Sequence, residues 1–84
     1  QAMEPRYKQG DTLFVDPTLD PIIGDDVVLL FEYADKLIGI FREVTELADD
    51  YVMVRTPTMN NPIKFHRTDL HNIHVVVGSQ RNRM

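Results

Sequence analysis

The sequence predicts a small all-β domain, bent into an antiparallel barrel or ribbon. The chain has 84 residues, enough for one hydrophobic core, so we expect a single domain over residues 1–84. Its apolar residues form short runs rich in β-branched and aromatic side chains, separated by Gly, Pro, Asn and Asp. No stretch of about ten or more residues repeats apolar side chains at the helical period of about 3.6. We therefore expect a meander of about five to six strands.

The first predicted strand covers residues 12–16, Thr-Leu-Phe-Val-Asp. It follows a turn at Gly10 and Asp11, where the glycine favours a change of direction. The loop after it contains Pro17 and Pro21, which cannot donate a hydrogen bond to a β-ladder. These prolines set the end of the strand.

A central strand is predicted at residues 26–33, after a second Gly-Asp turn at Gly24 and Asp25. Apolar residues follow one another along this strand and so occupy both of its faces, which is typical of a strand that is covered on both sides of the sheet. The polar segment 34–36 predicts a tight reversal into residues 37–44. The two strands should therefore pair as a hairpin.

The second half of the chain alternates strands with breaks. Residues 51–55 are rich in β-formers, and the loop 57–62, with a proline at each end, stops that strand. Residues 63–67 alternate apolar and polar side chains, and residues 68–72 predict a short connector or a single helical turn. Residues 73–77 predict the last strand.

The last predicted strand is a candidate dimer interface. It lacks the lysine, proline or bulge that protects a free edge strand, and only a polar tail at residues 79–84, expected to fray, follows it. We expect one face of this strand to fill the core and the other to meet a second copy of the chain. The residues assigned to this interface are Ile73, His74, Val75, Val76 and Val77.

Composition argues against several classes of function. A net charge of -4 and a pI near 5.1 do not suit a nucleic-acid-binding surface. The chain has no cysteine, which excludes disulfides and thiolate chemistry and permits a reducing compartment. Its apolar runs are far shorter than a membrane span or a signal-peptide core, so we expect no membrane partner.

Few residues are arranged as a chemical site would require. His71 and His74 form a His-x-x-His pair, but strand residues three apart face opposite sides, so we expect no metal and no cofactor. The acidic pairs at 25–26 and 49–50 are typical of turns and lack a calcium-loop spacing. No serine or threonine lies in a glycine-flanked elbow or beside a base in sequence.

Several motifs nevertheless follow one another in a characteristic order. They are Met3-Glu4-Pro5, Gly10-Asp11, Pro21-Ile22-Ile23-Gly24-Asp25 and the closing Ile73-His74-Val75-Val76-Val77-Gly78. This order resembles the carboxy-terminal domain of LexA and phage repressors, self-cleaving serine peptidases related to signal peptidase. The resemblance spans nearly the whole chain. It implies the same fold, and an amino-terminal helix-turn-helix domain and linker outside these 84 residues.

The resemblance also implies where a catalytic dyad would lie. In that family a serine just before the Met-x-Pro motif attacks the linker, and a lysine on the later hairpin strand acts as the base. The base must be a neutral amine, which burial favours by lowering the pKa of a lysine. Ala2 occupies the serine position and Phe41 the lysine position, so we expect no catalysis. By the same resemblance, Met3, Pro5 and Tyr7 line the cleft.

Three hypotheses of function follow from these observations. The first is a catalytically inactive dimerisation or regulatory domain of a LexA-like or prophage transcriptional repressor. Such a protein is cytoplasmic, forms a homodimer, reaches operator DNA through the missing domain and is compatible with a regulatory protein partner. The second is a self-cleaving peptidase with a mutated nucleophile and with Lys36 or Lys64 as the base. Lys36 lies ~16 Å from Phe41 along an extended strand, which is too far for it to take the place of a base at position 41. The third is a small β-barrel that binds nucleic acid or a peptide through its own surface.

Overall fold

The computed structural model describes residues 10–56, 58–59 and 61–81, which form six strands and one short 3-10 helix. In chain order these are β1 (Thr12–Asp16), β2 (Asp26–Tyr33), β3 (Lys36–Leu47), β4 (Tyr51–Arg55), β5 (Ile63–His66), the helix η1 (Arg67–Asp69) and β6 (Asn72–Gln80). Every pair of neighbouring strands is antiparallel. The prediction of an all-β antiparallel fold is confirmed.

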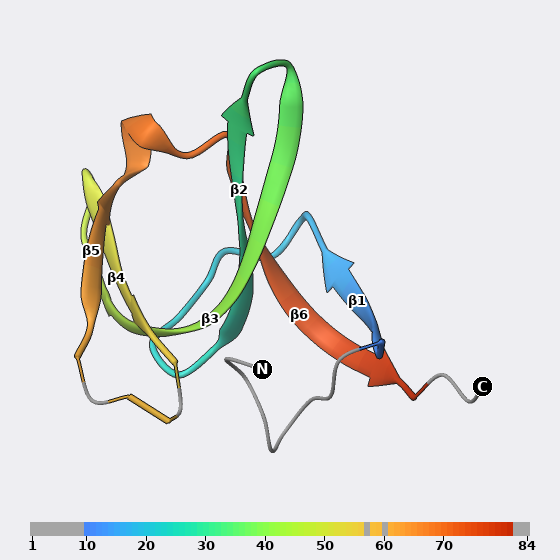
Figure 1. Ribbon diagram of the computed structural model, residues 1–84. Helices are drawn as coiled ribbons and strands as arrows, with labels where there is room; N and C mark the ends of the chain where they lie inside the picture. The colour runs from blue at the N-terminus through green and yellow to red at the C-terminus, as the bar shows by residue number, and fades with distance from the viewer. Residues whose placement is uncertain (1–9, 57, 60, 82–84) are drawn as a thin grey trace.

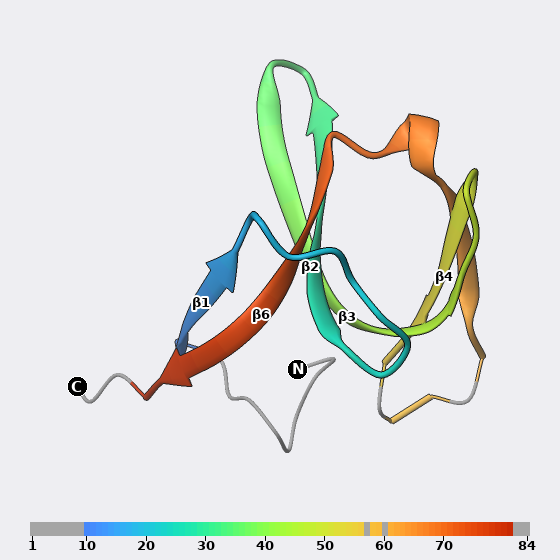
Figure 2. The same ribbon diagram turned by 180° about the vertical axis from the view of Figure 1, so that it is seen from behind.

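The strands form one open sheet in the order β1-β6-β2-β3-β4-β5 (Figure 1). From β2 to β5, each strand pairs with the next one along the chain. The chain then passes through η1 and returns, so that β6 lies beside β2, and β1 pairs with the far side of β6. The sheet bends strongly, but its end strands β1 and β5 lie apart and do not close a barrel (Figures 1 and 2).

The last strand, β6, is an inner strand, so the prediction that it forms a free sheet edge is wrong. Val75 pairs with Val27 of β2 on one side and with Asp16 of β1 on the other. The strand also continues to Gln80, into the segment assigned from sequence to a frayed tail. The prediction failed because the strand that covers this edge, β1, is near the other end of the chain, and local pattern carries no signal for that pairing.

The predicted hairpin of β2 and β3 is closed by a two-residue turn at Ala34 and Asp35. Tyr33 and Lys36 form the last cross-strand pair, and the φ angles of the turn residues are 51° and 63°. Two consecutive positive φ angles are the type I′ geometry, whose twist matches that of the flanking strands. This geometry usually selects Gly, which has no Cβ, or Asn, whose short polar side chain can hydrogen-bond locally.

A second turn ties the loop between β1 and β2 to β3. Gly24 has a φ of 96°, which favours glycine, and its N–H donates to the carbonyl of Val44 at 2.9 Å. The carbonyl of Asp25 accepts from the N–H of Val44 at 2.9 Å. Beyond this contact a bulge lets β3 follow β4 as far as Leu47, past the end predicted from sequence.

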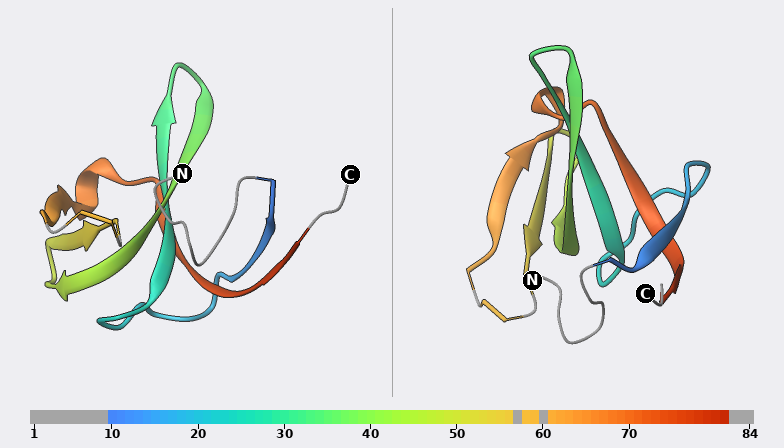
Figure 3. Two further views of the ribbon diagram at one scale, coloured as in Figure 1. Left: turned by 60° about the horizontal axis from the view of Figure 1, so that its bottom comes forward. Right: turned by 45° about the vertical axis from the view of Figure 1, so that its right-hand side comes forward.

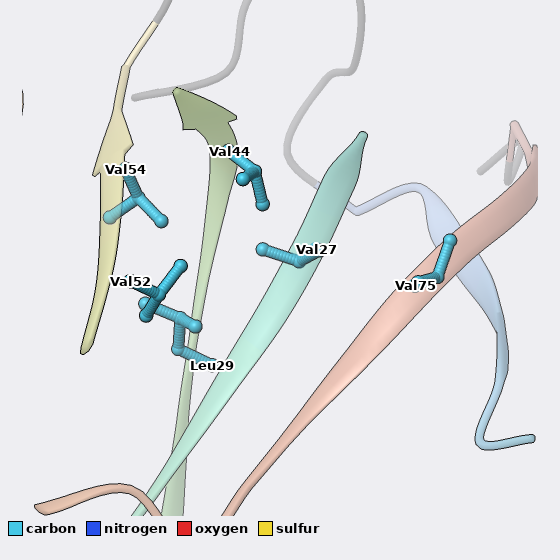
Figure 4. Close-up of a cluster of buried hydrophobic side chains, with 6 residues drawn as sticks. All are labelled: Val27, Leu29, Val44, Val52, Val54 and Val75. Atoms are coloured by element: carbon cyan, nitrogen blue, oxygen red, sulfur yellow. The ribbon is translucent and has the colours of Figure 1, made fainter. Parts of the chain in front are cut away.

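The core lies on one face of the bent sheet, called the inner face below; the opposite face is the outer face. Its buried side chains are Val27, Leu29, Val44, Val52, Val54 and Val75 (Figure 4). Among the described residues, no polar or charged residue is buried as a whole, and β1 contributes nothing to this core. Since each buried aliphatic side chain contributes about 1.5–3 kcal/mol, the fold depends on a few valines and one leucine. None of the described residues forms a helix long and apolar enough to cross a membrane.

Candidate functional site

Phe41, at the position expected for a catalytic base, lies on the outer face of the sheet. It pairs with Val28 of β2, which in turn pairs with His74 of β6, so the three residues form one cross-strand row. Successive strand residues face opposite sides of a sheet, and Val27 and Leu29, on either side of Val28, fill the core. The row therefore points away from the core, and all three of its side chains are half-buried.

Aliphatic side chains of β2 lie close to β3 just before Phe41. A Cβ placed on Gly39, two residues before it, would lie only 3.2 Å from Cγ1 of Val28 and 3.4 Å from Cδ2 of Leu30. Glycine at this position therefore lets the side chains of β2 lean across β3. The rest of the predicted cleft is outside the described residues: Ala2, Met3, Pro5 and Tyr7.

Neither alternative base lies beside Phe41. Lys36 begins β3 and pairs with Tyr33; it is an odd number of residues from Phe41, so its side chain faces the opposite side of the sheet. Lys64 is on β5, which β4 separates from β3, and its Nζ lies 4.3 Å from the centre of the Tyr51 ring. That position makes a cation–π contact. No described lysine is thus placed to replace a base at position 41.

The three histidines are spread over the sheet. His66 ends β5 opposite Tyr51, and the N–H of His71 donates to the carbonyl of Leu30 at 2.7 Å. His74 is in β6, and its Nδ1 is buried without a hydrogen-bond partner. In the part of the chain that the structure describes, no three His, Cys, Asp or Glu side chains are grouped so that they could hold a metal ion.

Two surface side chains have perturbed pKa values. The Asp16 carboxylate accepts hydrogen bonds from the hydroxyl of Thr18 at 2.6 Å and from its N–H at 2.9 Å, and these bonds lower the pKa of Asp16. The Tyr51 hydroxyl donates to the carboxylate of Glu46, and this hydrogen bond raises the pKa of Tyr51. Neither Asp16 nor Tyr51 lines the cavity described next.

A cavity of about 380 Å³ opens on the inner face, at the end of the sheet formed by β3, β4 and β5. Ile40, Val54 and Phe65, one from each of these strands, line it. Met59 and Ile63, two apolar side chains that are 57% and 56% exposed, also border it. The lining is therefore mainly apolar.

Four polar side chains also line this cavity: Arg42, Arg55, Thr56 and Asn61. The Nη1 of Arg42 donates to the carbonyl of Phe41 at 2.7 Å, and the hydroxyl of Thr56 is buried without a hydrogen-bond partner. Sequence analysis missed the cavity because its lining comes from separate strands and a loop. One signal of this cavity was present in the sequence. Arg42 is charged, but Ile40 and Val44, which lie on the same face of the strand, are apolar.

The other end of the sheet is a two-stranded ribbon formed by residues 12–16 and 75–80, called the β1–β6 ribbon below. It extends away from the core (Figure 3). Phe14, Val15 and Val77 are 47%, 38% and 56% exposed. Among the described strands only β6 pairs with β1. A two-stranded ribbon is only marginally stable by itself, and the described strands leave these three apolar side chains of the ribbon exposed.

The predicted interface residues divide between the core and the surface. Val75 is buried in the core and Ile73 packs against it, so these two face inward. His74 and Val76 alternate with them and are half-buried, and Val77 is exposed. Only the last three have side chains outside the core.

No protein-family model, curated protein or solved structure matches the chain. The function proposed below therefore rests on the motifs of the sequence and on the fold and surfaces described above.

Proposed function

We propose that this chain is a non-catalytic dimerisation domain of a LexA-like or prophage repressor. The observation that carries the proposal is the β1–β6 ribbon, which exposes Phe14, Val15 and Val77 and whose strand β1 adds nothing to the core. We take these exposed apolar side chains to mark a contact with another molecule. In a two-fold dimer the same ribbon of both copies would meet, and each would cover the other.

The order of motifs supports a repressor in particular. Both Gly-Asp turns precede strands, and their glycines, Gly10 and Gly24, have φ angles of 91° and 96°. In a repressor, a dimer of this domain holds two DNA-binding domains together so that they engage two half-sites. Such tethering raises operator affinity by about 10²–10⁴ without a new base contact.

The residues at the dyad positions argue against the peptidase alternative. Ala2 has no nucleophilic atom and Phe41 cannot accept a proton. Loss of one member of a catalytic set already removes most of the rate. Lys36 and Lys64, the other candidate bases, lie away from Phe41 in the sheet. A third function, binding of nucleic acid by the domain itself, is disfavoured by the net charge of -4.

Sedimentation velocity across the micromolar range tests the proposal. The expected result is a species of twice the monomer mass of 9.7 kDa that dissociates on dilution. Amide hydrogen exchange should slow in β1 and at the end of β6 as the dimer forms, because the ribbon then becomes covered. A monomer at every concentration would overturn the proposal.

A further inference from the structure

We propose that the cavity on the inner face binds a small apolar carboxylate. Its volume of about 380 Å³ is within the range of roughly 300–1,000 Å³ that is typical of small-molecule sites. Ile40, Val54 and Phe65 come from three adjacent strands and offer an alkyl or aryl group an apolar surface. Met59 and Ile63 extend this surface to the solvent.

Two arginines line the cavity, but Arg55 already forms an ion pair with Glu43 at 3.5 Å, so the charge of the ligand depends on Arg42. Its half-buried guanidinium donates one hydrogen bond to the carbonyl of Phe41, and no carboxylate among the described residues forms an ion pair with it. A guanidinium has five N–H donors, so most of them are available for a ligand. A carboxylate accepts two parallel hydrogen bonds from a guanidinium, whereas an ammonium would be repelled by it.

Thr56 supplies a second donor at the same cavity. Its hydroxyl is buried and has no hydrogen-bond partner. Buried polar groups without a partner are rare in folded proteins, and a bound water or ligand is one explanation for such a group. A carboxylate bound beside Arg42 would give this hydroxyl an acceptor.

The cavity and the β1–β6 ribbon lie at opposite ends of the strand order, so the two proposals are independent. β3, β4 and β5 line the cavity, and β1 and β6 form the ribbon. Failure of ligand binding would leave the proposed dimerisation untouched, and a monomeric chain could still bind the ligand.

An NMR titration of the ¹⁵N-labelled chain tests this inference, with sodium octanoate as the probe. Octan-1-ol and octylammonium chloride are matched controls that keep the alkyl chain and remove or invert the charge. The variants are Arg42→Gln, Thr56→Val and, as a control at an exposed arginine beyond β6, Arg81→Gln. Spectral dispersion shows for each variant that it is folded.

The expected result is saturable binding of octanoate, with shift changes confined to the strands and loop that line the cavity. Arg42→Gln should weaken binding by about tenfold and Thr56→Val by about threefold, while Arg81→Gln leaves it unchanged. Non-saturable or scattered shifts, equal binding of octylammonium, or unchanged affinity in Thr56→Val would overturn the inference. Thr56→Val decides the question even if Arg42→Gln does not fold, since this hydroxyl holds no hydrogen bond in the described structure.

Discussion

Phe41 pairs with Val28 across the β2–β3 ladder, on the face of the sheet that points away from the core. On its other side Val28 pairs with His74, so an aromatic ring ends a row that crosses three strands. A catalytic lysine at position 41 would project from the same face. The chain instead has a phenylalanine, which cannot accept a proton, as the proposed non-catalytic function requires.

Self-cleavage is not expected, even after the nucleophile is restored. Ala2→Ser supplies a hydroxyl, but Phe41 supplies no base, and a serine without a base is a poor nucleophile. The measurement is mass spectrometry of a longer chain that includes an upstream linker, held at pH 10, for the parent and for Ala2→Ser. A cleaved product from Ala2→Ser would show that another residue, such as Lys36 or Lys64, acts as the base.

Leu29 should be the most costly side chain to truncate in this small core. It is fully buried and pairs with Ile40 and Ile73, so Leu29→Ala should lower the free energy of unfolding by about 2–5 kcal/mol. The control is Ile22→Ala in the turn before β2, where the side chain is 65% exposed and the change should stay within about 0.5 kcal/mol. Urea unfolding measures both; similar losses in the two variants would contradict this core.

A glycine at position 34 should stabilise the hairpin turn. Ala34 has a φ of 51°, a region that costs an L-residue with a Cβ roughly 1 kcal/mol. Ala34→Gly should therefore raise the free energy of unfolding, by about 0.5–1 kcal/mol after the added entropy of the unfolded chain is subtracted. Ala48→Gly, at a position without a positive φ, should give no gain. A loss of stability in Ala34→Gly would show that the turn is not of type I′.

The pKa of Asp16 should respond to Thr18. Thr18→Val removes the hydroxyl donor and keeps the backbone N–H, so the pKa of Asp16 should rise toward its ordinary value of 3.8. Because folding lowers this pKa, the associated stability is present above the unfolded value and is lost as pH falls through the folded value. NMR titration of the Asp16 carboxyl group measures the shift. An unchanged pKa in Thr18→Val would show that the hydroxyl contributes nothing.

Local signals in the sequence predict the strands and turns well. The reversal after Tyr33 and the turn at Gly24 depend on residues adjacent in the chain, and both occur where expected. The extent of β3 and β6 was underestimated, because a bulge and a pairing with a distant strand extend them. The sequence shows which residues of β6 share a face, but it does not show which of the two faces is buried. In the structure the buried face is the one that carries Val75.

The candidate sites are harder to predict from the sequence than the strands and turns. The inner-face cavity combines residues of three strands and a loop, and no motif spans them. The exposure of Phe14 and Val77 follows from the place of β1 at the end of the sheet, which depends on long-range pairing. The position of Phe41 on a hairpin strand was predictable, because it depends only on the adjacent turn and the alternation of β3.

Sedimentation equilibrium of the parent, Val77→Lys and Ile63→Lys most directly tests the claim that the β1–β6 ribbon is a dimer interface. Val77 and Ile63 are both strand residues that are 56% exposed, but Val77 is in the ribbon and Ile63 is at the other end of the sheet. We predict a dimeric parent, a dimeric Ile63→Lys and a dissociation constant at least about tenfold higher for Val77→Lys, since a buried unpaired charge opposes association. A monomeric parent, or equal dimerisation of the two variants, would contradict the claim.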